Sequence, residues 1–239
     1  MTTLELFNGD CLEIMKGIPD ASIDLIICDL PYGCLTTGVG KEKINRADNP
    51  SKTNNRTTGL IVGCQWDVKI DLEKFWEQVK RIRRNKHSAC IHFCNTRFGV
   101  DLINSNPKEF RYDMVWNKMR GVGFLSANKK PMTSHEMIYI FGKEGVAYNR
   151  IDENTRCVLS VIENYNTSGH SGKQHPTAKP VELYKWLISR YSKEGDTILD
   201  PTFGSCNSGI VAMELNRNYI GIEMNEPFYD KAVNWFVEE

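Results

Sequence analysis

The sequence predicts an α/β fold with an open sheet, and three features of its 239 residues lead to this prediction. Short apolar runs rich in β-branched residues, such as residues 23–27, are typical of strands buried on both faces. Segments whose apolar residues recur at helical spacing separate these runs, for example residues 71–84. A strand, a tight turn, a helix and a second strand follow one another within residues 197–223. The chain is also long enough for one such domain with a sizeable core.

The composition narrows the classes of partner and the compartment. Lysine plus arginine and aspartate plus glutamate both number 30, so the formal net charge is zero and any face for a nucleic acid must be local. Eight cysteines occur without a secretory signal or the spacing of a disulfide framework, which favours reduced thiols. The amino terminus lacks a basic region followed by an apolar stretch, and the apolar runs are too short to span a bilayer. We therefore expect a cytoplasmic protein without a membrane partner.

The chain opens with a predicted strand at residues 4–7 and a short helix at residues 11–17. Asp10 and Glu13 form a capping pattern at the start of this helix, and capping alone can explain both acids. The buried strand at residues 23–27 comes next.

A short turn follows that buried strand. It consists of Asp29, Leu30, Pro31, Tyr32 and Gly33. Pro31 cannot donate to a sheet ladder, and Gly33 permits a sharp turn. Asp29 and Tyr32 should therefore lie just past the carboxyl end of the strand, at the edge where open α/β sheets bind ligands. A carboxylate, backbone carbonyls and an aromatic face in one turn can grip a planar group that carries an NH2. The alternative is an ordinary proline turn.

A long polar stretch, residues 35–63, comes directly after this turn. It is rich in Gly, Asn, Thr and Lys and has no sustained hydrophobic period. A structureless loop of this length is uncommon inside a compact domain, and such loops are usually lids or binding loops. We therefore favour a mobile functional loop over plain disorder.

The next helix and strand raise the question of a metal site. Residues 71–84 predict a helix that ends in the basic stretch KRIRRNK. Cations suit the negative end of the helix dipole, and we favour this explanation over a phosphate contact. Residues 88–94 predict a strand on which Cys90, His92 and Cys94 alternate onto one face. A metal ion would need a ligand from elsewhere, and no CxxC or HxxxH spacing offers one. We therefore expect a buried, sulfur-rich strand with a hydrogen-bonded histidine and no metal.

The middle of the chain predicts a helix at residues 96–104 and strands at residues 111–116 and 136–142. Residues 117–131, between these strands, are interpreted as a glycine-bearing basic loop with Phe124 near its centre. Residues 143–174 are irregular and polar, with one short strand. Pro180 then starts a helix with an apolar stripe.

Residues 197–223 form the second informative segment. A strand leads into the turn DPTFGSCNSG, which starts at Asp200, and a helix and a second strand ending at Glu223 follow. This is the layout of a mononucleotide-binding unit, in which the acid accepts hydrogen bonds from ribose hydroxyls. Only one of the usual close-approach glycines is present, so the dinucleotide fingerprint is poor. A generic strand–helix unit is the alternative.

Several segments, taken in order, resemble one enzyme family. They are DLPYG, WNK, GFLSANKKP, HE, HPTAKPVEL, DPTFGSCNSG and GIE. This set is similar to the exocyclic-amino DNA methyltransferases of the circularly permuted β group, N6-adenine type, including their small phage-borne and orphan members. The resemblance covers nearly the whole chain. It implies a doubly wound, mostly parallel sheet of the S-adenosylmethionine-dependent methyltransferase type with one reversed strand. It also implies a single domain, with a catalytic half at residues 1–142, a polar recognition or connecting region at 143–174 and a cofactor half at 175–239.

The resemblance further implies roles for individual residues. The catalytic motif is Asp29, Leu30, Pro31 and Tyr32. The residues implied to bind S-adenosylmethionine are Asp10 near the adenine ring, Asp29, Thr177 and Lys179 toward the methionine moiety, Asp200, Thr202, Phe203, Gly204 and Ser205 in the turn, and Glu223 at the ribose. Two positions depart from the family pattern: Thr202 stands where many members have Phe, and Cys206 stands where the turn usually has its second glycine. A side chain at Cys206 can crowd the cofactor, which would weaken its binding.

The chemistry of these residues agrees with the resemblance. An exocyclic amino group is a poor nucleophile because its lone pair is delocalised into the ring. The Asp29 carboxylate and the Leu30 carbonyl can accept its two N–H bonds, and Tyr32 can stack on the base, which is worth about 1–3 kcal/mol. The methyl group then moves in line from the sulfonium, and positioning supplies most of the catalysis. The target base must flip out of the duplex to reach this turn.

We therefore predict a DNA methyltransferase that modifies the N6 amino group of adenine in double-stranded DNA. Asp at the first motif position is typical of adenine enzymes, whereas cytosine enzymes often carry Ser, and N4-cytosine methylation is the alternative within the family. A catalytically silent nucleic-acid-binding subunit is the alternative of another class, and the intact catalytic motif and Glu223 argue against it. The resemblance leaves open a homodimer and a restriction-endonuclease counterpart, as in restriction-modification systems. With no separate recognition domain evident, base reading is expected from residues 35–63, 117–131 and 143–174.

Overall fold

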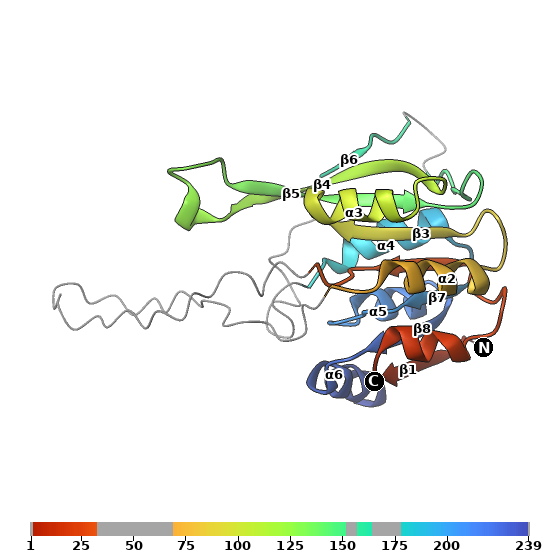
Figure 1. Ribbon diagram of the computed structural model, residues 1–239. Helices are drawn as coiled ribbons and strands as arrows, with labels where there is room; N and C mark the ends of the chain where they lie inside the picture. The colour runs from red at the N-terminus through yellow and green to blue at the C-terminus, as the bar shows by residue number, and fades with distance from the viewer. Residues whose placement is uncertain (1, 33–68, 152–156, 164–177, 239) are drawn as a thin grey trace. The chain divides into compact units, whose positions relative to one another are not determined.

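The computed structural model describes residues 2–32, 69–151, 157–163 and 178–238 (Figure 1). The chain divides into two compact units. The first unit contains Met1–Leu30 and Asp71–Glu239. The second unit is Pro31–Ile70, of which the structure describes the first two and the last two residues. The single-domain organisation expected from the sequence stays a prediction. The predicted loop at residues 35–63 lies outside the described residues, and the architecture below is that of the first unit.

The first unit is built on one sheet, in which eight strands of the described residues pair. The strands are β1 (Leu4–Asn8), β2 (Leu25–Cys28), β3 (Ala89–Cys94), β4 (Phe110–Val122), β5 (Thr133–Phe141), β6 (Val161–Ile162), β7 (Thr197–Asp200) and β8 (Asn218–Glu223). Their order across the sheet is β1-β8-β7-β2-β3-β5-β4-β6. Neighbouring strands are parallel except at β5, which is antiparallel to both β3 and β4. The predicted mostly parallel sheet with one reversed strand is therefore confirmed.

Helices cover both faces of this sheet (Figure 1). They are α1 (Cys11–Ile14), which continues as the 3₁₀ helix η1 (Met15–Gly17), α2 (Leu72–Ile82), α3 (Thr96–Ser105), the 3₁₀ helix η2 (Phe124–Ser126), α4 (Val181–Tyr191), α5 (Asn207–Glu214) and α6 (Glu226–Glu238). The rings of Phe75 and Trp76 on α2 contact His92 of β3. Phe93, the next residue of β3, contacts Tyr184 of α4 instead. Because successive side chains of a strand point to opposite faces, α2 and α4 lie on opposite faces of the sheet, which is the doubly wound arrangement.

Local signals in the sequence set the positions of these elements. Strands β2 and β3 are buried along their whole length, as strands covered on both faces should be. Helix α2 begins where the Asp71 carboxylate accepts hydrogen bonds from the backbone N–H groups of Glu73 and Lys74. The apolar stripe of this helix is buried and consists of Phe75, Trp76, Val79 and Ile82. The strand predicted at residues 23–27 and the helix predicted at 71–84 therefore form as expected, with shifted ends.

The loop predicted at residues 117–131 is wrong for residues 117–122, which belong to β4, whereas residues 123–131 connect β4 to β5. β4 continues to Val122, which pairs with Thr133 of β5, and the two strands run past the rest of the sheet as a hairpin (Figure 1). The pairing changes register between Asn117 and Val122, where Met119 has a φ of 54°. Side chains on both faces of this ribbon are largely exposed, so its sequence lacks the alternation that marks a half-buried strand. Helix α6, which follows β8, was also not predicted.

Within the part of the chain that the structure describes, every helix is too short or too polar to cross a membrane. The cysteines in that part are free thiols.

Candidate active site

The candidate site lies where the chain changes direction across the sheet. β2 pairs with β3 on one side and with β7 on the other, and β7 pairs with β8. From β2 the chain continues to β3 on one side, and from β7 it continues to β8 on the other side. β2 and β7 therefore flank a topological switch point. Asp29 directly follows β2, and Asp200 is the last residue of β7. Both predicted acids thus lie at the carboxyl ends of the two central strands, where doubly wound folds bind ligands.

The Asp29 carboxylate pairs with a lysine from a distant part of the chain. Its Oδ2 accepts a hydrogen bond from Nζ of Lys179, which lies 150 residues later in the sequence. Only 6% of the Lys179 side chain is exposed. The same ammonium group is 3.1 Å from Oε1 of Glu136 on β5 and 5.2 Å from the ring centre of Phe93. One buried cation therefore contacts the residue that follows β2 and residues of β3 and β5.

A second lysine extends this group of charges. Nζ of Lys118 on β4 is 2.7 Å from Oε2 of Glu136. Burial acts to raise the pKa of Glu136, but the charges of Lys179 and Lys118 outweigh it and lower that pKa. Burial likewise acts to lower the pKa of Lys179, and the charges of Asp29 and Glu136 raise it instead. We call these four residues the charged cluster; it alternates two acids with two lysines.

The other residues of the predicted catalytic motif follow Asp29 in the chain. Leu30 closes the first segment of the first unit and is 1% exposed. Pro31 and Tyr32 belong to the second unit, and both are partly buried. The roles assigned to these residues from the sequence stay predictions.

Asp200 is buried at the end of β7 and accepts two hydrogen bonds. Its Oδ2 accepts one of 2.6 Å from the Ser208 hydroxyl, and its Oδ1 accepts one of 3.0 Å from the backbone N–H of Thr202. The Ser208 hydroxyl also lies 2.8 Å from the hydroxyl of Tyr219. Burial raises the pKa of Asp200 to about 7, although its two hydrogen bonds oppose this change. The fold therefore places an acid that titrates near neutral pH at this edge.

Glu223 ties the turn after β7 to the end of β8. Its Oε2 accepts a 2.9 Å hydrogen bond from the backbone N–H of Gly204, and its Oε1 accepts one of 2.7 Å from that of Asn225. Gly204 has a φ of 53°, a left-handed conformation that favours glycine. Burial raises the pKa of Glu223, and the backbone donors oppose this. Asp10 comes two residues after β1, whose Asn8 pairs with Glu223, so the acids predicted for the adenine and the ribose lie at the ends of adjacent strands.

Comparison with known proteins identifies the family. The DNA methylase family of the N6/N4 type matches residues 23–234, which is most of the chain. The chain belongs to this family. The Type II methyltransferase M.HinfI of Haemophilus influenzae is 29% identical over 250 residues, which cover 95% of this methylase and 66% of M.HinfI. This methylase thus spans just under two thirds of that relative's length. The Type II methyltransferase M.Cfr9I of Citrobacter freundii is 26% identical over 261 residues, which cover 96% of this methylase and 86% of M.Cfr9I.

Solved structures share the fold of this methylase. M1.HpyAVI in complex with SAM has a TM-score of 0.67 at 19% identity, over 98% of both chains. The cytosine-N4-specific PvuII DNA methyltransferase has a TM-score of 0.71 at 17% identity, over 97% of this methylase and 86% of that chain. At these identities the likeness shows the fold alone.

The two turn residues that depart from the family pattern are packed in different ways in this methylase. Cys206 is 1% exposed and has a φ of 57°. A Cβ built on Gly209 would lie 2.8 Å from Cys206 Sγ, so the thiol packs against the start of α5 inside the first unit. Thr202 Oγ1 is buried and has no hydrogen-bond partner within the described residues. The expected effect of Cys206 on cofactor binding stays a prediction.

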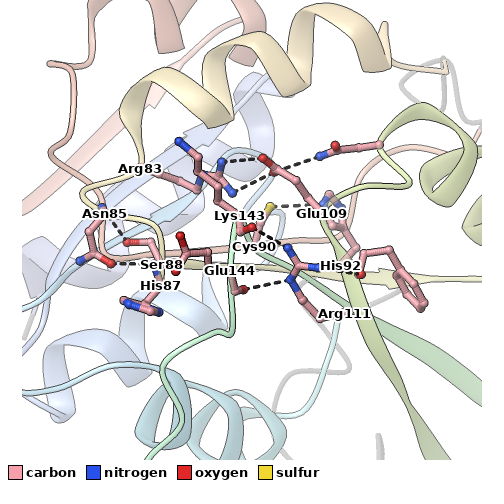
Figure 2. Close-up of polar contacts among 12 residues, drawn as sticks. Arg83, Asn85, His87, Ser88, Cys90, His92, Glu109, Arg111, Lys143 and Glu144 are labelled. Atoms are coloured by element: carbon pink, nitrogen blue, oxygen red, sulfur yellow. Dashed lines mark hydrogen bonds and ion pairs between the residues drawn. The ribbon is translucent and has the colours of Figure 1, made fainter.

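Cys90 and His92 form a buried group in the core of the methylase (Figure 2). Nε2 of His92 is 3.3 Å from Cys90 Sγ, and Nδ1 is 3.2 Å from Cys28 Sγ. These ligand atoms lie within 4.8 Å of one another, so β2 adds Cys28 to the set considered from the sequence. Cys94 is buried as well. Aromatic rings from α2 and β5 contact the imidazole, and they belong to Phe75, Trp76 and Phe141. The predicted buried, sulfur-rich strand with a hydrogen-bonded histidine is therefore confirmed.

Other predicted site residues have no described contact with Asp29, Asp200 or Glu223. Thr177 lies outside the described residues, as do parts of the connecting region at 143–174. Phe203 and Ser205 lie in the turn after β7; Phe203 is 3% exposed, and Ser205 is half-buried. Their predicted contacts with a cofactor stay predictions.

Glu136 and Lys118 join the candidate site, although neither residue was predicted to belong to it. Both occur in segments that carry the family resemblance, HE and WNK. Antiparallel pairing of β4 with β5, which sets Trp116 opposite Glu136, brings the two segments together. The segments were thus visible in the sequence, and the missing information was which strands are neighbours.

Proposed function

We propose that this methylase transfers a methyl group from S-adenosylmethionine to the N6 amino group of an adenine flipped out of double-stranded DNA. The observation that carries the proposal is the Asp29 carboxylate, held by Lys179 at the switch point of the sheet. A carboxylate is a charged acceptor, roughly twice as strong as a neutral hydroxyl, and it suits an amino group whose N–H bonds must be held.

The ends of β7 and β8 fit a cofactor that carries a nucleoside. Thr202 Oγ1 is a buried polar atom without a partner within the described residues, and a bound ligand would satisfy it. The Glu223 carboxylate is anchored to the turn through Gly204 and retains lone pairs for ribose hydroxyls. Asp10, Asp200 and the turn residues would hold the remainder. When bound, S-adenosylmethionine supplies the methyl group on its sulfonium, and the M1.HpyAVI complex with SAM supports this choice of cofactor.

The residues of the catalytic motif act by orientation. The Asp29 carboxylate and the Leu30 carbonyl accept the two N–H bonds of the target amino group, which favours a pyramidal nitrogen with an available lone pair. Tyr32 stacks on the flipped base, which is worth about 1–3 kcal/mol. No covalent intermediate with the protein is required, so precise placement accounts for most of the rate. Cys28 precedes Asp29, but burial raises the pKa of its thiol, and it supplies no thiolate nucleophile.

DNA binding is assigned to the β4–β5 hairpin together with the predicted loops. Arg120, Lys129 and Lys130 of the hairpin are exposed, and Phe124 at its tip is 80% exposed. Basic side chains contact phosphates, and an exposed apolar ring on a projecting element is suited to contact unstacked bases. Because the formal net charge of the chain is zero, a polyanionic partner needs a local basic element such as this hairpin.

N4-cytosine methylation is the second candidate. The structurally similar PvuII enzyme is cytosine-N4-specific, and the two amino groups are chemically alike. Asp29 in place of the Ser common in cytosine enzymes favours adenine. A homodimer and a restriction-endonuclease counterpart stay predictions from the resemblance.

Product analysis tests the proposal. DNA treated with the purified protein and S-adenosylmethionine is digested to nucleosides, which are separated by mass spectrometry. We expect N6-methyladenine; N4-methylcytosine as the sole product would overturn the adenine assignment. The matched control is Asp29→Ala, which should give no methylated nucleoside while its calorimetric Kd for S-adenosylmethionine stays close to that of the wild type. Loss of cofactor binding in folded Asp29→Ala would place Asp29 at the cofactor and not at the base.

A further inference from the structure

Lys179 is fixed at both ends of its side chain. Its backbone carbonyl accepts a 2.7 Å hydrogen bond from Nδ2 of Asn207, the first residue of α5. It directly precedes Pro180, the N-cap residue of α4. Its Nζ pairs with the two acids, Asp29 and Glu136, and lies 5.2 Å from the ring centre of Phe93. The ammonium group is therefore held in place by two helix starts and by the strands it reaches.

The charges of this cluster depend on one another. With 6% of its side chain exposed, Lys179 cannot be solvated by bulk water, so it needs the acids that contact it. The reverse also holds, because Asp29 and Glu136 both lie within bonding reach of one Nζ and would repel each other without it. Since the two acids favour the charged form of Lys179, Lys179 favours the charged forms of the acids by the same free energy.

We propose that Lys179 is a positioning residue for methyl transfer, which holds the Asp29 carboxylate ionised and in one orientation while Glu136 and Lys118 hold Lys179. This inference rests on the proposed function, in which Asp29 must accept an N–H bond from the target base. A protonated Asp29 would present a hydroxyl donor to that N–H group. The role differs from the contact with the methionine moiety that the resemblance implies for Lys179.

The cluster also ends at the proposed DNA-binding element. Lys118 lies on β4 where the β4–β5 hairpin leaves the sheet, and 23% of its side chain is exposed. Its Nζ lies 5.0 Å from the ring centre of Trp116, which is buried. The chain of ion pairs thus runs from the base of the hairpin to the catalytic turn.

A ¹³C NMR titration of the Asp29 carboxyl group in the ligand-free protein tests the proposal without relying on activity. Lys179→Met leaves two acids with one lysine, and Glu136→Gln leaves one acid with two lysines. Relative to the wild type, we expect the Asp29 titration midpoint to rise by at least about one pH unit in Lys179→Met and to fall in Glu136→Gln. Among the described residues, the titratable groups Cys28, Cys94, Tyr184 and Asp200 also act on Asp29, and they are common to all variants.

Kinetics give the second readout. The acidic limb of kcat/KM should move in the same direction as the Asp29 midpoint, and kcat of Lys179→Met should fall by about a hundredfold. The Kd for S-adenosylmethionine should stay unchanged. Lys185→Met is the matched control, since Lys185 lies on α4 with 48% of its side chain exposed, and it should change none of these quantities.

The outcomes separate this proposal from the proposed function. If the Asp29 midpoint moves in neither variant, the positioning role is wrong. If the midpoints move as expected but the wild type methylates no DNA, the ion pairing stands and the proposed function fails. Loss of S-adenosylmethionine binding in folded Lys179→Met would assign Lys179 to the cofactor and overturn the proposal. Should Lys179→Met not fold, Glu136→Gln decides alone, because it retains the pair with Asp29.

Discussion

Asp200→Asn should make the ligand-free methylase more resistant to unfolding at pH 8. Asp200 is 1% exposed, and burial raises its pKa from 3.8 to about 7. Asparagine has the same shape, and its oxygen and NH2 group can replace the contacts with the Thr202 backbone N–H and the Ser208 hydroxyl. The substitution therefore removes a titration and changes little else.

The sign of the effect follows from proton binding. Between about pH 4 and pH 7, the unfolded state has lost the Asp200 proton while the folded state retains it, so the free energy of unfolding falls as pH rises. Each pH unit is worth about 1.4 kcal/mol. Over the roughly three pH units from 3.8 to about 7, the free energy of unfolding of the wild type should therefore fall by about 4 kcal/mol relative to that of Asp200→Asn. At higher pH the difference should stay constant.

Urea denaturation of the ligand-free proteins across this pH range measures the difference. Asp230→Asn makes the same change at an exposed aspartate on α6. Its free energy of unfolding should depend on pH in the same way as that of the wild type. If the free energies of unfolding of the wild type and Asp200→Asn showed the same dependence on pH, the reasoning from the buried acid would be refuted. Because we propose that Asp200 lines the cofactor, calorimetry at pH 8 should show weaker S-adenosylmethionine binding by Asp200→Asn. Proteins often lose stability where their function needs a buried charge.

Three further predictions concern the turn, the hairpin and the core. Cys206→Gly should have a free energy of unfolding about 1 kcal/mol higher than Cys206→Ala in urea, because both lose the thiol and only glycine relieves the φ of 57°; equal values would contradict this. Replacing Lys129 and Lys130 by Gln should reduce the slope of log K for DNA against log salt by about 2 without changing cofactor affinity, and an unchanged slope would remove the hairpin from the DNA interface. Arg83 forms a two-pronged ion pair with Glu109 at 2.9 and 3.0 Å (Figure 2). Glu109→Leu alone should cost about 3–5 kcal/mol in urea denaturation, and adding Arg83→Met should recover part of it; additive losses would argue against the pair.

Elements whose signals are local can be predicted from the amino-acid sequence alone. The apolar run of β2, the Asp71 cap and apolar stripe of α2, and the turn that starts at Asp200 each depend on residues close together in the chain. The signal for helix α6 is local too, since Phe228, Ala232 and Phe236 recur at helical spacing. Such signals persist whatever packs on the element, because caps and periodicity are properties of the segment alone.

Contacts between residues far apart in the chain depend instead on how the whole sheet is assembled. Lys179 reaches Asp29 across 150 residues, and Glu136 meets Lys118 because β5 runs antiparallel to β4. The hairpin that carries these strands beyond the sheet exposes both of its faces, so glycines and basic residues there imitate a loop. Strand neighbours are selected by the burial of the whole sheet and by chain closure over long separations, and no short stretch of sequence encodes either.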